Sequence, residues 1–494
     1  MSGAKIVVGS GGEDRRCTDQ ILLALPTGSG SEGMANVEWQ AHLDDSEERH
    51  LEEVCALLRI PSVSALPAHR AEMRAAAEWV AARLRAVGVP KVELLGPESH
   101  PLVFGRWIVD PGAPVTMIYG HYDVQPPDPL DLWRTPPFAP TLRDGNLSAR
   151  GAADDKGPIV AAIQAVEALV QAGGRPPLNL AFFFEGEEEI GSPSLAALVH
   201  AERERMACGV VLSADGVMFG VDDPSLTLST KGMLKGEIAV RAAASDLHSG
   251  LFGASTPNAL QVLGKILASL HTDEGAVAVP GFYARARALS DRERAEIAAV
   301  PFDDAAFLAE TGAPALWGEP GYSVLERLWM RPTIDLNGLW GGFQGAGSKT
   351  VTPCAAHAKF TCRLVAGQDP AEILRLIREH VARVCPPWAT AEVSGGEGSA
   401  FAFEIAGDHP ALLAAGETIR ELYGKEPLRI RLGGTLPVAE IFQRELGADM
   451  VFFAWEQADN NLHAPDEFVR LSDLAIARRA WCMLLTRLGS GGGG

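Results

Sequence analysis

Histidine and carboxylate side chains closely follow three apolar stretches of this sequence. The stretches and their side chains are Val115–Tyr119 with His121, Asn179–Phe184 with Glu185, Glu187, Glu188 and Glu189, and Val210–Ser213 with Asp215. If the stretches are strands of an open α/β sheet, ligands bind at their carboxyl ends, so we expect these side chains to converge. One glutamate in a loop is usually exposed, but four beside a buried strand repel one another unless a cation holds them. The pattern therefore predicts a metal site.

Two further stretches complete a set of metal ligands. Asp154 and Asp155 lie in a Gly-rich turn before an apolar run that is expected to form a buried helix. His463 lies far downstream in a polar loop, where a single histidine would normally be exposed. Together with the first group, these residues provide two imidazoles, a carboxylate that two ions could share, further carboxylates and a spare glutamate as general base. That is a complete set for hydrolysis assisted by two metal ions.

The elements that must position these residues show two different patterns of secondary structure. Up to about residue 227, strand-like apolar stretches alternate with helical patterns, which favours a mostly parallel sheet with helices on both faces. Near Leu228 the pattern changes to half-buried strands, a helix at about 257–270, an irregular region rich in Pro and Gly to about 347, and two strands flanking a helix. We therefore predict the α/β class, with a mostly parallel catalytic domain interrupted by an inserted α+β lid or dimerisation domain.

The predicted domain boundaries lie where the pattern of secondary structure changes. The catalytic domain is expected to comprise 44–227 and 408–488, with 228–407 as the inserted domain. Residues 1–43 are predicted to be an extension, disordered or added during cloning, and residues 489–494 a Gly-rich tail.

Composition excludes several other classes of function. The formal net charge of −20 argues against nucleic acid and anionic membrane surfaces as partners, because both favour a basic protein surface. No apolar run approaches the roughly 20 residues of a membrane span. The seven cysteines include no C-x-x-C pair, which predicts free thiols in a reducing compartment and a cytoplasmic location.

The motifs, taken in order, resemble those of the M20 metallopeptidases. They are GHYDVQP, RGAADDKGP, EGEEEIGS, SADG, DLHSG, KTVTP, RLGGTLP and LHAPDE. The resemblance extends from about Asp44 to Leu488, and eight motifs in the right order make it highly specific. Within the family, DLHSG, KTVTP and GGTLP point to the cytosolic, carnosinase-like dipeptidase branch.

The resemblance implies a role for each residue of the metal site. His121 and Asp215 would bind one ion, Glu189 and His463 the other, and Asp154 both, with Glu188 as general base, Asp123 orienting His121, and a cis bond between Asp154 and Asp155. The implied cofactor is a pair of divalent metal ions per chain, zinc in the first place, with manganese or cobalt as alternatives. Other histidines, His42 and His50 among them, match no motif and are expected at surface or packing positions.

The resemblance also implies roles in the inserted domain. Arg363 would clamp the free carboxylate of a small peptide substrate, with Thr350, Thr435 and Gly434 as further substrate contacts. His248 would reach across a homodimer, formed through the inserted domains, and hydrogen-bond the oxyanion in the partner's active site.

The predicted function is hydrolysis of the amide bond of dipeptides or dipeptide-like substrates. A water activated between the two metal ions would attack the carbonyl, and Glu188 would take its proton and pass it to the leaving amine. The alternative is an N-acyl amino acid deacylase or carboxypeptidase that uses the same centre but binds no free substrate amine. A non-catalytic binding protein on a decayed scaffold is the third hypothesis, and the complete set of ligands speaks against it.

Overall fold

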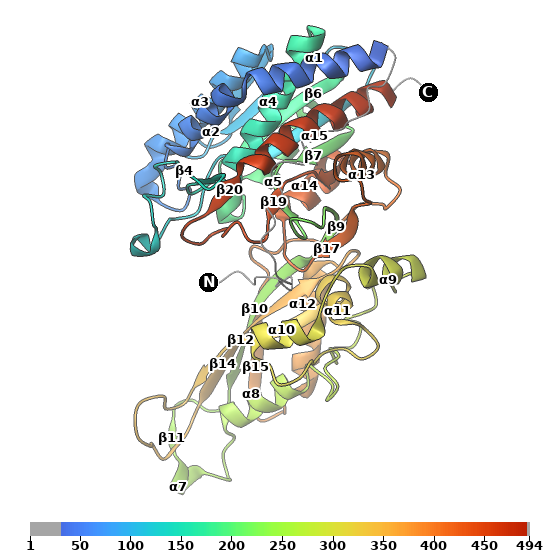
Figure 1. Ribbon diagram of the computed structural model, residues 1–494. Coiled ribbons are helices and arrows are strands. Elements are labelled where there is room, and N and C mark those ends of the chain that lie inside the picture. The colour runs from blue at the N-terminus through green and yellow to red at the C-terminus, as the bar shows by residue number, and fades with distance from the viewer. Residues whose placement is uncertain (1–30, 492–494) are drawn as a thin grey trace. The chain divides into compact units, whose positions relative to one another are not determined.

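The structure of the protein is a computed structural model that describes residues 31–491, and it divides into two compact units (Figure 1). Unit 1 comprises the described residues up to Leu226, Ile405–Arg429 and the residues from Ile441 onward, and unit 2 comprises Thr227–Glu404 and Ile430–Glu440. Unit 2 is thus inserted into unit 1. The segment Ile430–Glu440, which the sequence analysis assigns to the catalytic domain, instead belongs to unit 2, where Arg431 pairs with Glu296 and Thr435 bonds to Arg363.

Helix α1 (Ser31–Asp45) lies mostly within the stretch 1–43, which the sequence analysis predicts to be an extension. Trp39 and Leu43 are buried, and the helix packs against α4 (Lys156–Gly173). Removing two large apolar side chains from water is sufficient reason for this part of the stretch to fold onto unit 1. The part of the predicted extension before residue 31, and residues 492–494 of the predicted tail, lie outside the described residues.

Unit 1 is built on a six-stranded sheet with the strand order β1-β2-β6-β3-β7-β18. The strands are β1 (Lys91–Leu95), β2 (Leu102–Trp107), β6 (Asn179–Glu185), β3 (Val115–His121), β7 (Val210–Ser213) and β18 (Asp449–Phe452). Strands β6, β3, β7 and β18 pair in parallel, whereas β1 and β2 form an antiparallel edge. The prediction of a mostly parallel sheet is confirmed.

Helices cover both faces of this sheet. Besides α1 and α4 they are α2 (Glu47–Leu58), α3 (Arg70–Val87), α5 (Leu195–Ala201), α6 (Arg203–Met206), α13 (Pro410–Tyr423), α14 (Pro437–Leu446) and α15 (Leu471–Ser490). Gly120 of β3 lies against Ile159 of α4, while the ring of its neighbour Tyr119 packs edge-on against Phe442 of α14. Because successive residues of a strand point to opposite faces, α4 and α14 lie on opposite sides of the sheet.

Three small sheets bring together short strands from distant parts of the sequence. One contains β20 (Phe468–Arg470), β5 (Asn146–Ser148) and β4 (Thr141–Arg143), and a second pairs β19 (Glu456–Gln457) with β8 (Val217–Met218). The third contains β16 (Phe403–Glu404), β9 (Ser225–Thr230) and β17 (Leu428–Leu432). Within residues 31–491, none of the helices combines the length and the apolar character needed to cross a membrane.

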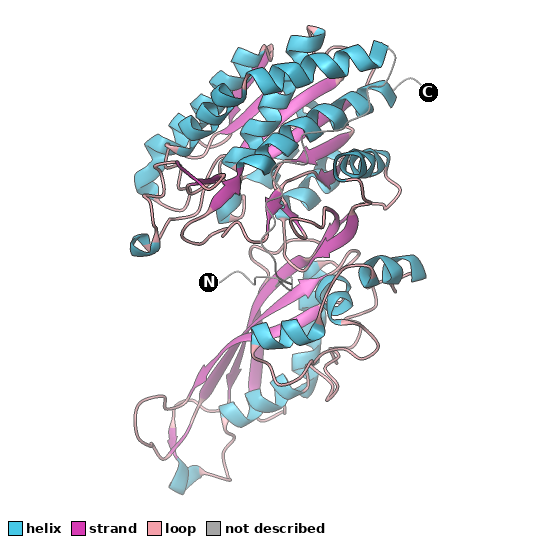
Figure 2. Cartoon of the chain, in the orientation of Figure 1, coloured by secondary structure: helices cyan, strands magenta, loops and turns pink. Residues whose placement is uncertain are grey.

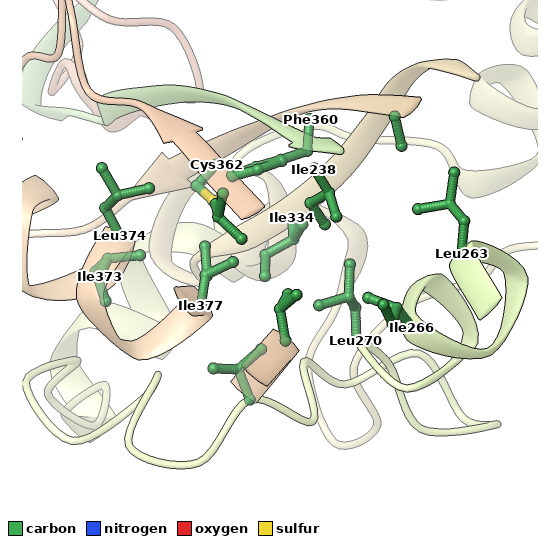
Figure 3. Packing of buried hydrophobic residues seen from close by; sticks show 14 of the residues in the cluster. Ile238, Leu263, Ile266, Leu270, Ile334, Phe360, Cys362, Ile373, Leu374 and Ile377 are labelled. Carbon is green, nitrogen blue, oxygen red and sulfur yellow. The ribbon is translucent and has the colours of Figure 1, made fainter. Parts of the chain in front are cut away.

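Unit 2 packs helices on one face of an antiparallel sheet, whose strands are drawn in magenta in Figure 2. The order is β12-β14-β10-β15, with β12 (Thr333–Gly341), β14 (Ala355–Leu364), β10 (Gly232–Arg241) and β15 (Thr390–Gly395). Ile238, Ile334, Phe360 and Cys362 of this sheet face side chains of α8 (Ala259–Ala268) and α12 (Pro370–Val384) in one buried cluster (Figure 3). The sheet residues alternate between this cluster and the other face, as expected for a sheet covered on one side.

The region predicted to be irregular, to about residue 347, contains regular elements. They are α9 (Asp291–Ala298), α10 (Asp304–Thr311), α11 (Val324–Met330) and strand β12. The alternation that identifies a strand is lost in β12, because its register with β14 shifts between Leu336 and Gly338. The remaining elements of unit 2 are β11 (Leu247–His248), which pairs with β13 (Val351–Thr352), and α7 (Ser249–Phe252).

Candidate metal centre

Three neighbouring parallel strands carry predicted ligands toward one edge of the unit 1 sheet. Strand β3 ends at His121, which lies opposite Glu185 in the pairing with β6. Strand β7 pairs with the other side of β3 and ends at Ser213, two residues before Asp215. The carboxyl ends of the strands therefore bring these side chains to one place, as predicted.

The five predicted ligands form two groups that share Asp154. The groups are His121, Asp154 and Asp215, and Asp154, Glu189 and His463, and the ligand atoms in each group lie within 4.8 Å of one another. Nε2 of His121 is 2.9 Å from Oδ1 of Asp154, whereas Nε2 of His463 is 2.8 Å from Oδ2 of the same carboxylate. Nε2 of His463 is also 3.1 Å from Oε2 of Glu189. Asp154 therefore offers one oxygen to each group.

The donor atoms suit a pair of divalent cations. Imidazole nitrogen and carboxylate oxygen bind Zn²⁺ at about 2.0–2.2 Å, so two ligand atoms of a tetrahedral ion lie roughly 3.3–3.6 Å apart. The distances from histidine nitrogen to carboxylate oxygen extend from 2.8 Å for His463 and Asp154 to 4.0 Å for His121 and Asp215, which brackets that separation. Small side-chain adjustments would let each group hold one ion.

Asp123 is completely buried and contacts two of these ligands, His121 and Glu189. Nδ1 of His121 faces the main-chain oxygen of Asp123 at 3.1 Å and its Oδ1 at 3.4 Å. Oδ2 of Asp123 accepts a hydrogen bond of 3.1 Å from the main-chain N–H of Glu189. A histidine that donates its Nδ1 hydrogen presents a lone pair at Nε2, which is the atom that faces Asp154. This geometry fits the predicted orienting contact.

The four glutamates at the end of β6 and directly after it have two kinds of partner. Glu185 accepts a hydrogen bond of 2.8 Å from the hydroxyl of Tyr119, and Glu187 accepts bonds from the main-chain N–H and the hydroxyl of Ser194. These two carboxylates are therefore satisfied by the protein itself. Glu189 belongs to a ligand group, and the charges that act on Glu188 include those of that group.

Burial among like charges raises the pKa values of the carboxyl groups at this centre. The pKa of Glu188 is well above its usual range, first because of burial and then because of the carboxylates of Asp215, Glu189 and Asp154. Burial and the charge of Asp154 also raise the pKa of Glu189 to about 7 and that of Asp215 to about 6. Hydrogen bonds to Asp154 and Glu189 raise the pKa of His463 to about 11. Divalent cations would supply the positive charge that this cluster otherwise takes up as protons.

The loop that carries Asp154 is held by residues to which the sequence analysis gave no role. The bond between Asp154 and Asp155 is cis, as the resemblance implies. Glu467, fully buried, accepts hydrogen bonds from the main-chain N–H groups of this loop. A second residue without a predicted role is Gln125, whose Nε2 donates to Oε2 of the ligand Glu189 at 2.8 Å. Glu467 and Gln125 stand inside quoted motifs, so their place in LHAPDE and GHYDVQP is the signal that could have identified them.

The predicted substrate contacts lie in unit 2, in two groups. Arg363 of β14 donates a hydrogen bond of 2.7 Å to the hydroxyl of Thr435, and the carbonyl of the adjacent Gly434 accepts one of 2.8 Å from the N–H of Lys231. His248 ends β11 and Thr350 directly precedes β13, and the N–H of Ser249 donates to the carbonyl of Thr350 at 3.1 Å. The structure thus brings Arg363, Thr435 and Gly434 together, and separately His248 and Thr350.

A third group of potential ligands, His42, His50 and Glu167, is occupied by cationic side chains. Oε2 of Glu167 lies 2.8 Å from NH2 of Arg49 and 2.7 Å from NH2 of Arg83. NH2 of Arg49 is also 3.3 Å from Nε2 of His50, which is completely buried. Two guanidinium groups therefore neutralise this carboxylate. His50 is a packing residue, as predicted, and it joins α2 to α4.

Comparisons with known proteins agree with the motifs. The family described as peptidase family M20/M25/M40 matches residues 117–487. The Cys-Gly metallodipeptidase dug1 of Schizosaccharomyces pombe is 29% identical over 91% of this chain and 97% of its own. The β-Ala-His dipeptidase of Homo sapiens is 30% identical over 74% of this chain and 73% of its own. Among solved structures, the M20 family metallo-carboxypeptidase Sso-CP2 from Sulfolobus solfataricus superposes with a TM-score of 0.75 and 29% identity, covering 89% of this chain and 99% of that one.

Proposed function

The chain belongs to peptidase family M20/M25/M40 and is a peptide-bond hydrolase, and we propose that it cleaves dipeptides with two divalent metal ions. The observation that carries the proposal is Asp154, whose two oxygens face two different histidines at 2.9 and 2.8 Å. The similarity to the Cys-Gly and β-Ala-His dipeptidases supports dipeptides as the substrate class.

The two groups of side chains are proposed to hold one metal ion each. His121 and Asp215 would hold one ion and Glu189 and His463 the other, with Asp154 shared. Zinc is the first expectation, and manganese or cobalt are alternatives for the same donors. When bound, the ions would lower the pKa of a water toward neutrality and polarise the substrate carbonyl.

Glu188 is the proposed general base. Its carboxylate stands next to the ligand Glu189 in the chain, and it is under the influence of both ligand groups. It would take a proton from the attacking water and deliver it to the nitrogen of the leaving amine. Asp123, through Nδ1 of His121, would keep the Nε2 lone pair of that histidine directed at its ion.

Residues of unit 2 are proposed to recognise the substrate. The guanidinium of Arg363, supported by the hydroxyl of Thr435, would bind the free α-carboxylate through two parallel hydrogen bonds. Gly434 and Thr350 would add polar contacts, and His248 would donate to the oxyanion from the partner subunit of a homodimer.

A carboxypeptidase or N-acyl amino acid deacylase is the second candidate function. The similarity to a metallo-carboxypeptidase at a TM-score of 0.75 favours it, since that protein shares fold and family with this chain. The two functions differ in whether the site binds a free substrate amine.

A substrate panel tests the proposal. The protein is stripped of metal with a chelator, reconstituted separately with Zn²⁺, Mn²⁺ and Co²⁺, and assayed on dipeptides, including Cys-Gly and β-Ala-His, and on N-acetyl and N-succinyl amino acids. We expect dipeptide hydrolysis to vanish on stripping and return with metal. Turnover of the N-acyl substrates alone would favour the second candidate, and no hydrolysis with any of the metals would refute the proposal.

A further inference from the structure

Glu467 is a buried carboxylate that connects the loop of Asp154 to the loop of His463. It follows His463 by four residues and is completely buried. Its Oε1 accepts hydrogen bonds from the main-chain N–H groups of Ala153 at 3.0 Å and Asp154 at 3.2 Å. Its Oε2 accepts from the N–H of Gly151 at 2.9 Å and from NH1 of Arg150 at 2.7 Å. One side chain therefore accepts four hydrogen bonds, three from main-chain N–H groups and one from a guanidinium, from a loop more than 300 residues away in the chain.

The main chain on either side of Glu467 is also fixed. The carbonyl of Glu467 accepts a hydrogen bond of 3.1 Å from the N–H of Ala149, and β20, which begins at Phe468, pairs with β5. The N–H of Phe468 donates to the carbonyl of Asn460 at 3.1 Å, which closes the His463 loop. Hydrogen bonds of Glu467 and its neighbours thus hold both loops in fixed positions.

The other metal ligands are held by different means. His121 ends a strand, and its main-chain N–H donates to Oδ2 of Asp155 at 3.0 Å. Asp215 follows β7, and Glu189 donates its N–H to Asp123. Among the proposed ligands, it is Asp154 and His463 whose loops meet at Glu467, and their contact is the 2.8 Å distance between Oδ2 and Nε2.

We propose that Glu467 is a positioning residue that sets the separation of Asp154 and His463 and thereby the affinity of the group that they form with Glu189 for its metal ion. The inference rests on the proposed two-metal site. Glu467 belongs to neither ligand group, and it acts through the backbone of the shared ligand Asp154. Weakening this contact should therefore lower the metal affinity of the weaker binding step more than that of the stronger step.

The test replaces Glu467 by Gln and measures Zn²⁺ binding by competition with a chelator. The substitution keeps the shape of the side chain but turns one acceptor into an N–H₂ group that faces N–H donors. We expect the weaker binding step to lose about 10–100-fold in affinity, the range found for partners that orient metal ligands. Glu467→Asp keeps the charge opposite Arg150 but withdraws both oxygens from the loop, so it should lose affinity in the same direction.

Glu326 of unit 2 provides a matched control. It is 6% exposed, accepts a hydrogen bond of 2.7 Å from NH1 of Arg294, and accepts another of 2.7 Å from the N–H of Ser323. Glu326→Gln should lower thermal stability without changing either metal affinity. Wild-type affinity in Glu467→Gln, or in Glu467→Asp if the first variant does not fold, would overturn the positioning role. A wild-type chain that binds no Zn²⁺ would overturn the proposed function together with this inference.

Discussion

Glu188 is the residue on which the proposed proton transfer depends. Glu188→Gln removes the base while keeping the size of the side chain, so metal binding should persist while turnover falls. Loss of a general base costs roughly 10²–10⁴-fold in rate. The measurement is kcat on a dipeptide together with the metal content per chain by elemental analysis.

A neighbouring glutamate provides the control for that variant. Glu187 is buried, and its carboxylate accepts a hydrogen bond from the N–H of Ser194. Glu187→Gln should lower the melting temperature and leave most of the rate intact. If Glu188→Gln keeps a substantial share of the wild-type rate at full metal content, Glu188 is not the base.

Arg363→Lys tests the recognition of the substrate carboxylate. A guanidinium binds a carboxylate with two parallel hydrogen bonds, and an ammonium cannot reproduce that geometry. The variant should lose kcat/KM strongly on dipeptides with a free C-terminus and much less on their amides. Kinetics on matched free and amidated dipeptides check this, and an equal loss on both would assign Arg363 a different task.

The sequence predicts single residues well where a motif fixes both type and position. His121, Asp154, Glu189, Asp215 and His463 all fall in quoted motifs, and the structure brings them into two groups. It predicts less well which acidic residues are satisfied internally, because hydrogen bonds such as Tyr119 to Glu185 depend on the register of two strands. Only the folded chain shows that Tyr119 binds Glu185 and that Ser194 binds Glu187.

At the scale of elements, β3 and α4 must lie close together for the centre to form. A β-carbon on Gly120 would overlap Cγ2 of Ile159 and Oδ2 of Asp155, the oxygen that accepts the N–H of His121. Gly120→Ala should therefore destabilise the protein by about 1–3 kcal/mol, the usual cost of overpacking, and weaken Zn²⁺ binding by displacing Asp155. Thermal unfolding and chelator competition measure the two effects.

Gly264 of α8 serves as the control for that substitution. An added β-carbon there meets no atom within 4 Å. Because alanine is the better helix former by about 1 kcal/mol, Gly264→Ala should slightly raise stability and leave metal binding unchanged. A Gly120→Ala variant with unaltered stability would mean that β3 and α4 tolerate more separation than the structure indicates.

The predicted elements agree with the structure where hydrophobic periodicity is regular. Strand β3 and helix α4 are buried along most of their length, so their patterns are clear in the sequence. Strand β12 has no clear pattern in the sequence, because its bulge interrupts the alternation. The return of Ile430–Glu440 to unit 2 has no signal in the sequence either, because long-range contacts such as Arg431 with Glu296 produce no periodicity.

At the scale of the whole molecule, the proposed role of His248 requires a second chain at each active site. His248 lies in unit 2, is exposed, and accepts a hydrogen bond of 3.0 Å from the N–H of Gly250 at Nδ1. That bond caps a turn of its own chain, which is the plainer role for this histidine. It occupies one ring nitrogen, and the other, Nε2, could donate to an oxyanion if it carries the proton.

Mixing two inactive chains separates the capping role from a role across a homodimer. A donor to the oxyanion is worth roughly 10²–10³ in kcat, so His248→Ala should be nearly inactive, as should Glu188→Gln. If His248 serves the partner's site, a mixed dimer has one site with both defects and one with neither. After subunit exchange at equal concentrations, half of the dimers are mixed, so activity should return to roughly a quarter of the wild-type value. If His248 serves its own chain, every site keeps one defect and the mixture stays inactive. Persistent inactivity despite subunit exchange verified with differently tagged chains, or a fully active monomer in sedimentation, would therefore exclude the role across the dimer.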